Sequence, residues 1–172
     1  MNGESPDSIQ GAGRTYAERG IVRRMSMEDL GAVLKIEQSS FPTPWTSHAF
    51  ATELRDNEYA CYFCLESESK VIGYMGLWFI LDEGHITNIA ISPDFRHQGW
   101  GKFLLSTVMQ RMAENGMERM TLEVRATNYS AQKLYEQLGF TKAGVRKGYY
   151  IDNQEDAIIM WAELPGHQII HG

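Results

Sequence analysis

The chain has 172 residues and a formal net charge of −6. That length favours one domain with a sizeable core, and its 43% hydrophobic and 22% charged content is ordinary for a soluble globular protein. The acidic balance argues against a general binder of nucleic acid or of anionic membrane, and it suits a cationic substrate. No apolar run approaches the roughly 20 residues that span a bilayer, and no signal-peptide pattern opens the chain, so we expect a cytoplasmic protein.

The expected domain spans residues 20–164. Residues 1–19 are polar and without periodicity, which predicts a flexible N-terminal extension, and residues 165–172 form a weakly patterned tail. Cys61 and Cys64 lie three apart in a strand-like segment. Their side chains should therefore point to opposite faces and cannot easily share a disulfide or a metal. The five histidines have no ligand-like spacing either, so no metal is expected.

Local patterns predict six to seven strands and about four helices. The helices should begin near Ser26, at Thr46 or Ser47, after the Gly99–Gly101 segment, and near Asn128. Strands are expected at 21–25, 59–66, 71–79, 85–91, 119–124, 140–150 and 156–163. The order β-α-α-β-β-β-α-β-α-β-β indicates an α/β fold with a mixed, mostly antiparallel sheet. Helices should cover both faces, and the middle β-α-β unit should be parallel.

The segment from His85 to Asn115 is the most typical of a ligand site. A buried strand leads through Pro93 into a loop with Gly99 and Gly101, and an amphipathic helix follows. Glycines at a helix entrance let a ligand approach the backbone, and the unpaired N–H groups there favour an anion. Mobile positive charge comes from the neighbouring side chains of Arg96, His97 and Lys102. This arrangement suits a pyrophosphate.

Tight packing alone is the competing interpretation of such a glycine pair, and two better-known phosphate loops do not fit. The Rossmann pattern needs a third glycine where Leu104 stands, and the P-loop needs Ser or Thr where Phe103 stands. What remains is the pattern Arg96-x-x-Gly99-x-Gly101 after a strand. It resembles the acyl-CoA pyrophosphate loop of the GCN5-related N-acetyltransferases (GNAT).

Further motifs carry the same resemblance from about Ile21 to Leu164. The segments are Phe41-Pro42-x-Pro44-Trp45, Asn88–Ile91, Leu122–Asn128, Leu134–Phe140, Gly148–Tyr150 and Asp156–Met160. Together they are similar to the RimI-like branch, the ribosomal-protein-alanine N-acetyltransferases. The resemblance implies the GNAT fold, acetyl-CoA as cosubstrate, and acetylation of a protein N-terminus, with a ribosomal protein that begins with alanine as partner. Direct nucleic-acid or membrane partners are not expected, and the enzyme should be a monomer or a weak dimer.

Two other functions stay open at this stage. The same fold could acetylate a small-molecule amine or an internal lysine, because substrate loops decide the acceptor. A non-catalytic module that senses acyl-CoA is the third interpretation, and the presence of both Glu123 and Tyr135 argues against it.

The resemblance also implies roles for single residues. Glu123 corresponds to the proton acceptor of the branch, acting directly or through water, and Tyr135 to the proton donor beside the coenzyme sulfur. Positions that correspond to coenzyme contacts are Ile89, Ala90, Ile91, Arg96, His97, Gln98, Gly99, Trp100, Gly101, Lys102, Asn128 and Tyr135. Without the family, Glu123 is typical of an ion-pair partner, Tyr135 of a core residue and Asn128 of a helix N-cap.

Five residues are candidates for the acceptor site: Glu37, Phe41, Trp45, Tyr149 and Tyr150. Glu37 falls on the apolar face of its helix, so it either reaches solvent from the helix edge or binds substrate. Phe41 and Trp45 flank two prolines and could form a specificity wall or simply close the fold. Tyr149 and Tyr150 could line a peptide groove or form an aromatic pair in a hairpin.

Overall fold

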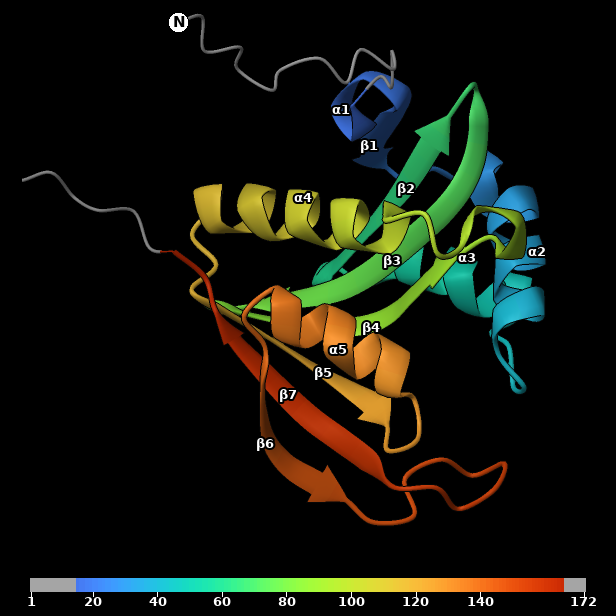
Figure 1. The fold of residues 1–172 in the computed structure, drawn as a ribbon. Coiled ribbons are helices and arrows are strands. Elements are labelled where there is room, and N and C mark those ends of the chain that lie inside the picture. The colour runs from blue at the N-terminus through green and yellow to red at the C-terminus, as the bar shows by residue number, and fades with distance from the viewer. Residues whose placement is uncertain (1–14, 166–172) are drawn as a thin grey trace, which may run out of the picture.

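The computed structural model describes residues 15–165, in which a mixed sheet carries helices on both faces (Figure 1). Hydrogen bonds connect the strands in the order β1-β2-β3-β4-β5-β7-β6. The strands are β1 (Gly20–Arg24), β2 (Ala60–Ser67), β3 (Lys70–Ile80), β4 (Glu83–Ile91), β5 (Arg119–Arg125), β6 (Thr141–Arg146) and β7 (Ala157–Glu163). The helices are α1 (Tyr16–Arg19), α2 (Leu30–Ser40), α3 (Ser47–Asp56), α4 (Trp100–Glu114) and α5 (Tyr129–Gln137), with 3₁₀ turns at Met27–Asp29 and Pro93–Phe95.

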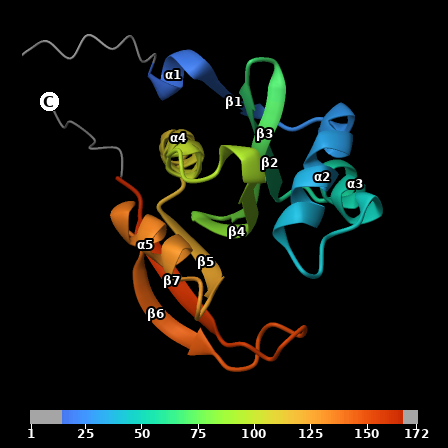
Figure 2. The ribbon, with the colours of Figure 1, turned by 45° about the vertical axis from the view of Figure 1, so that its right-hand side comes forward.

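Two hydrophobic clusters cover the two faces of the sheet. One lies beneath α4 and α5, and the other lies beneath α2 and α3, as Figure 2 shows with the sheet between the two helix pairs. Cys64 is buried in the α2/α3 cluster, whereas Cys61 packs against the other. Both cysteines are free. The prediction that they face opposite sides of a strand is therefore confirmed.

The pairing of β4 with β5 determines where the sheet opens. These parallel strands are in register only from Glu83↔Arg119 to His85↔Thr121. Beyond that point both strands continue, but they diverge, as the ribbon shows (Figure 1). The later part of β4 therefore lacks a strand partner on its β5 side, and its backbone groups there, apart from the Ile91 carbonyl that Arg96 binds, are available to a ligand.

A β-bulge in β4 lies where this opening begins. Leu77 pairs with Ile86 and Gly76 pairs with Asn88, so Thr87 is an extra residue on β4. One extra residue reverses the faces to which the following side chains point. The Tyr62 hydroxyl lies 3.2 Å from Thr87 Oγ1 and ties the bulge to β2.

The predicted order of elements is confirmed, with a parallel β4–β5 pair between antiparallel neighbours. The strand expected at 140–150 is wrong in its second half, because β6 ends at Arg146. Gly148 has φ +59°, and the Tyr150 N–H bonds to the Glu155 carbonyl, which closes a loop. Within the described residues, no helix is long and apolar enough to cross a membrane.

The expected N-terminal extension differs from the structure at its end. Residues 1–14 and 166–172 lie outside the described residues, but Tyr16–Arg19 form a helical turn. The Tyr16 hydroxyl donates a hydrogen bond to the Gln98 carbonyl, and its ring packs edge-on against Trp100 with 5.0 Å between centroids. These contacts, with that of Arg19 over the Trp100 ring, hold α1 on the domain.

Gly76 is expected to be required for stability, because a Cβ there would lie 2.2 Å from the Tyr62 ring. Gly76→Ala should lower the free energy of unfolding by about 1–3 kcal/mol, since the buried ring must move. Gly31→Ala in α2 is the matched control, because nothing lies within 4 Å of its Cβ position. That change should stabilise by up to about 1 kcal/mol through helix propensity. Equal stabilities of the two variants in urea denaturation would contradict this account.

Candidate active site

Two cavities meet where β4 and β5 diverge. The first has a volume of about 660 Å³ and is walled by α2, the loop after it, β5 and the β6–β7 loop. The second, of about 510 Å³, lies along the end of β4 beside the N-termini of α4 and α5. The two adjoin, because they share the lining residues Ser40, Phe41, Ile89, Asn128 and Tyr135. A molecule that fills both would pass through the opening in the sheet.

The N-terminus of α4 borders the second cavity. Gly99 has φ +84°, and the first helical hydrogen bond runs from the Phe103 N–H to the Gly99 carbonyl. The N–H groups of the first turn therefore have no partner within the helix and suit an anion. A Cβ on Gly101 would lie 3.6 Å from Leu134 and 3.8 Å from Ile91, both of which line the cavity. Gly101 thus leaves space in the cavity itself, which fits the pyrophosphate of a coenzyme A.

Most of the expected coenzyme contacts line the second cavity: Ile89, Ala90, Ile91, Arg96, His97, Gly99, Trp100, Gly101, Lys102, Asn128 and Tyr135. Gln98 lines neither cavity. Its side-chain amide donates to the Asp94 carbonyl, and its own carbonyl accepts from Tyr16. Trp100 is only 1% exposed, and its indole belongs to the core beneath α4.

The Arg96 side chain is tethered, contrary to the expectation that it is mobile. Its guanidinium donates to the Ile91 carbonyl at 2.9 Å and to Ser40 Oγ at 2.8 Å. These bonds fix the end of β4 against the end of α2. The positive charge stays beside the cavity, but its position is set by the fold.

Tyr135 projects from α5 to the junction of the two cavities. The residue is 8% exposed and its ring lies 5.8 Å from that of Phe140. Burial, with a smaller contribution from Tyr150, raises the pKa of Tyr135 to about 12. Its hydroxyl is therefore protonated at neutral pH and can act as a proton donor. Asn128 caps α5 by accepting from the Ala131 N–H at 3.2 Å and also lines both cavities.

Glu123 lies on β5, past the last residue that pairs with β4, and lines the first cavity. Its carboxylate accepts a 2.7 Å hydrogen bond from His85 Nε2, and Arg146 is 3.7 Å from its other oxygen. Burial acts to raise the pKa of Glu123, but the hydrogen bond and charge of His85 and the charge of Arg146 outweigh it. The pKa is lowered overall, so the group is an acceptor-only carboxylate at neutral pH.

Glu37 is 2% exposed, so the interpretation that it reaches solvent from a helix edge is wrong. Its carboxylate accepts from the Trp45 N–H at 3.0 Å and from the Tyr74 hydroxyl. Burial raises the pKa of Glu37. These contacts hold the loop after α2 against the sheet, where Phe41 and Trp45 both pack against the core and line the first cavity.

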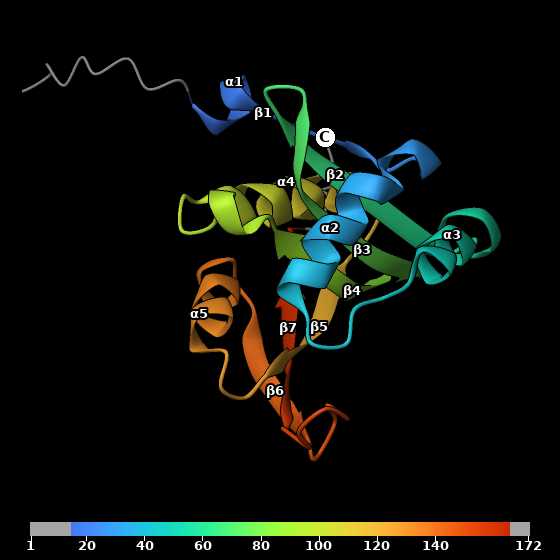
Figure 3. The same cartoon turned by 90° about the vertical axis from the view of Figure 1, so that its right-hand side faces the viewer.

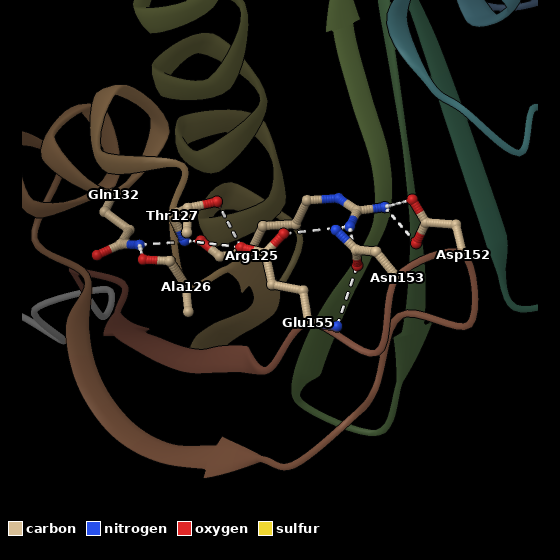
Figure 4. A network of polar contacts seen from close by, with 7 residues as sticks. All are labelled: Arg125, Ala126, Thr127, Gln132, Asp152, Asn153 and Glu155. Atoms are coloured by element: carbon tan, nitrogen blue, oxygen red, sulfur yellow. Dashed lines mark hydrogen bonds and ion pairs between the residues drawn. The ribbon is translucent and has the colours of Figure 1, made fainter.

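Arg125, at the end of β5, anchors the β6–β7 loop over the first cavity (Figure 4). Its guanidinium binds both oxygens of Asp152 at 3.0 and 3.1 Å, and also contacts Asn153 and Glu155. The same group lies 4.0 Å from the centre of the Tyr150 ring. Tyr149 meets Tyr150 edge-on at 5.1 Å. The two tyrosines thus form an aromatic pair in the loop that connects the antiparallel strands β6 and β7, and both also line the first cavity.

Sequence reasoning missed the contributions of His85 and Arg125. The signal for His85 was the β4–β5 register, which places it beside the strand that carries Glu123. The signal for Arg125 was its place two residues after Glu123, which puts both side chains on one face of the strand. The signal for His85 can be used only once the strand pairing is known, whereas the spacing of Arg125 from Glu123 can be read from the sequence.

The fold places two adjoining cavities where an open strand edge meets the N-terminus of α4. The chain belongs to the acetyltransferase (GNAT) family, whose family model matches residues 30–140. It is therefore an N-acetyltransferase that uses acetyl-CoA as cosubstrate, as the sequence predicted.

Individual relatives place the chain more narrowly within the family. It is 43% identical over 146 residues to a Bacillus subtilis protein named as a putative ribosomal protein bS18-alanine N-acetyltransferase. The match covers 85% of this chain and 97% of that one. The Escherichia coli K12 enzyme of the same name is 37% identical and is matched over 94% of its length, against 81% of this chain. The crystal structure of the Escherichia coli ribosomal-protein-S18-alanine N-acetyltransferase superposes with a TM-score of 0.79 and 34% identity, covering 87% of this chain and 98% of that one.

Releasing the β6–β7 loop should weaken binding of the acceptor but not of acetyl-CoA. Arg125→Lys keeps the charge and loses the planar contacts to Asp152 and Tyr150. We expect KM for the acceptor to rise about fivefold, equivalent to about 1 kcal/mol, with KM for acetyl-CoA unchanged. Arg119→Lys is the control, because Arg119 pairs with Glu83 on the exposed surface. An equal rise in both KM values would show that the loop does not serve the acceptor alone.

Proposed function

We propose that this enzyme acetylates the N-terminal amine of a ribosomal protein that begins with alanine. Glu123 receives the amine proton, and Tyr135 gives a proton to the departing sulfur. The observation that carries the proposal is that both side chains line the first cavity, where it adjoins the coenzyme cavity. The names of the Bacillus subtilis and Escherichia coli relatives support the choice of acceptor. The reaction would take place in the cytoplasm.

The charge of the first cavity supports a cationic acceptor. Its lining includes the Glu123 carboxylate, whose pKa is lowered, and the Asp152 carboxylate, which is paired with Arg125. An N-terminal ammonium would be attracted there and would then lose a proton. The aromatic wall of Phe41, Trp45 and Tyr149 leaves room for a short chain behind the amine.

Protonation equilibria favour an α-amine over a lysine. An α-amine with a pKa near 8 is about one-tenth neutral at pH 7, whereas a lysine near 10.4 is neutral in only about one molecule in 2,500. Acetyl-CoA supplies a thioester as the acetyl donor. As the amine nitrogen bonds to the carbonyl carbon its proton becomes acidic, so a carboxylate such as Glu123 is a sufficient acceptor. The phenol of Tyr135 is protonated and can donate its proton to the departing sulfur.

The acceptor class is tested by a panel of peptides with varied first residues, plus an N-blocked peptide with an internal lysine. We expect thiol release and acetylation at the α-amine to be fastest with alanine first, and no product from the blocked peptide. Mass spectrometry identifies the modified nitrogen. Acetylation of the internal lysine alone, or of free polyamines in preference to peptides, would overturn the proposed acceptor while leaving the enzyme class intact.

Tyr135→Phe should lower kcat by about a hundredfold, in the range expected for loss of a general acid. The melting temperature should stay close to that of the unmodified enzyme, because the ring that packs on Phe140 is retained. Tyr129→Phe is the control on the same helix, since Tyr129 is 72% exposed and lines neither cavity. Full turnover by the Tyr135 variant would remove this residue from the mechanism.

A further inference from the structure

His85 and Glu123 join the two strands at the point where the sheet opens. His85 is the last residue of β4 that pairs with β5, and its partner there is Thr121. Glu123 follows two residues later, so it lies on the same face of β5 as Thr121. The 2.7 Å bond between His85 Nε2 and Glu123 Oε2 therefore spans the base of the opening.

The direction of this hydrogen bond follows from the charge of the carboxylate. An ionised Glu123 can only accept, so His85 must donate from Nε2. The His85 side chain is 37% exposed, whereas that of Glu123 is 10% exposed. The imidazole thus reaches from solvent to a nearly buried carboxylate and fixes one of its two oxygens.

The imidazole is itself held by a residue of β3, the strand on its other side. The Trp78 ring meets it edge-on, with 6.2 Å between centroids. The Trp78 indole N–H donates to Glu53 on α3 at 3.0 Å, and the same Glu53 oxygen accepts from Asn57. A continuous set of contacts therefore runs from α3 through β3 to the carboxylate on β5.

The other charged groups around Glu123 do not substitute for His85. Arg146 on β6 lies 3.7 Å away from Oε1, and its side chain is 54% exposed. The Tyr150 hydroxyl, in the β6–β7 loop, is within electrostatic range, and burial raises its pKa to about 12, so it is neutral. Among these groups, His85 makes the short hydrogen bond that fixes direction as well as charge.

We propose that His85 is a positioning residue for acetyl transfer, whose imidazole holds the Glu123 carboxylate in place to receive the acceptor's proton. This inference rests on the proposed role of Glu123 and adds a residue to it. The N–C bond forms as the C–S bond of the thioester breaks; the amine proton goes to Oε1 of Glu123, the oxygen that His85 does not bind, and the departing sulfur takes the proton of Tyr135. His85 keeps its own Nε2 proton throughout.

The test compares His85→Gln with His85→Asn, which differ by one methylene. The glutamine amide is long enough to donate to Glu123, and the asparagine amide is too short. We expect His85→Asn to lower kcat by roughly tenfold to a hundredfold, as for other small misplacements of a reacting group. His85→Gln should restore most of the rate, and His48→Asn on the exposed side of α3 should change nothing.

A pH profile separates positioning from a purely structural effect. The His85 hydrogen bond lowers the pKa of Glu123, so its loss raises that pKa. Activity that needs the ionised carboxylate is lost as the pH falls through the higher value. The acidic limb of kcat should therefore move to higher pH in His85→Asn and stay near its original position in His85→Gln.

Combining each change with Glu123→Gln gives the decisive outcome. If His85 acts through Glu123, His85→Asn should cost nothing further in the Glu123→Gln background. Equal losses in both backgrounds, or equal rates for the Gln and Asn variants, would overturn the proposal. Full activity of Glu123→Gln alone would instead remove Glu123 from the proposed mechanism. The assay uses whichever amine the peptide panel identifies, so a different acceptor leaves this test intact.

Discussion

The short parallel pairing of β4 with β5 is the constraint on which the site depends. Three registered residue pairs hold the two halves of the sheet together, and the strands then part. Had the pairing continued to Ile91, it would have used the backbone groups that face the second cavity and closed the passage to the first. The bulge at Thr87 sets which side chains of β4 point to each face beyond this point. A sheet edge inside the domain is normally avoided, so its presence here indicates a place for an extended ligand. In Figure 3 the loop after α2 passes beside β4 and β5 and the β6–β7 loop lies below the end of β5; residues of both loops line the first cavity.

The two cavities are built from different parts of the chain. The second offers mainly backbone: the free edge of β4, the first turn of α4 and the space left by Gly101. Such features follow from the fold, so they are suited to a cosubstrate shared by a whole family. The first is lined by side chains from two loops. The Glu37 carboxyl group holds one loop by accepting from the Trp45 N–H, and the Arg125 guanidinium holds the other by binding Asp152. Loops of this kind can change without disturbing the sheet, which is why acceptor choice is a separate property from the fold.

Local sequence patterns were sufficient for the order of elements, for the glycine-opened helix and for the opposite faces of Cys61 and Cys64. They were insufficient wherever a property arises from pairing between distant segments. The burial of Glu37 depends on Tyr74, 37 positions along the chain, and the contact between His85 and Glu123 depends on strand register. The tether on Arg96 and the contact of Tyr16 with the Gln98 carbonyl likewise join segments that no periodicity relates. The strand expected through Tyr150 ended early because Gly148 turns the chain with a positive φ, and the Arg125 clasp then holds Tyr149 and Tyr150 in a loop.

The environments of Glu123 and Tyr135 differ in the way that acid–base chemistry requires. Both side chains are largely buried, and burial alone would raise the pKa of each. For Tyr135 burial dominates, so the phenol keeps its proton. For Glu123 the hydrogen bond from His85 and the charges of His85 and Arg146 outweigh burial, so the carboxylate is free to take one. Two groups beside one cavity are thereby kept in opposite protonation states at neutral pH, a pattern typical of paired donors and acceptors. Because His85 and Arg146 outweigh burial in setting the protonation state of Glu123, the proposed proton acceptor depends on residues that lie outside the β5 motif.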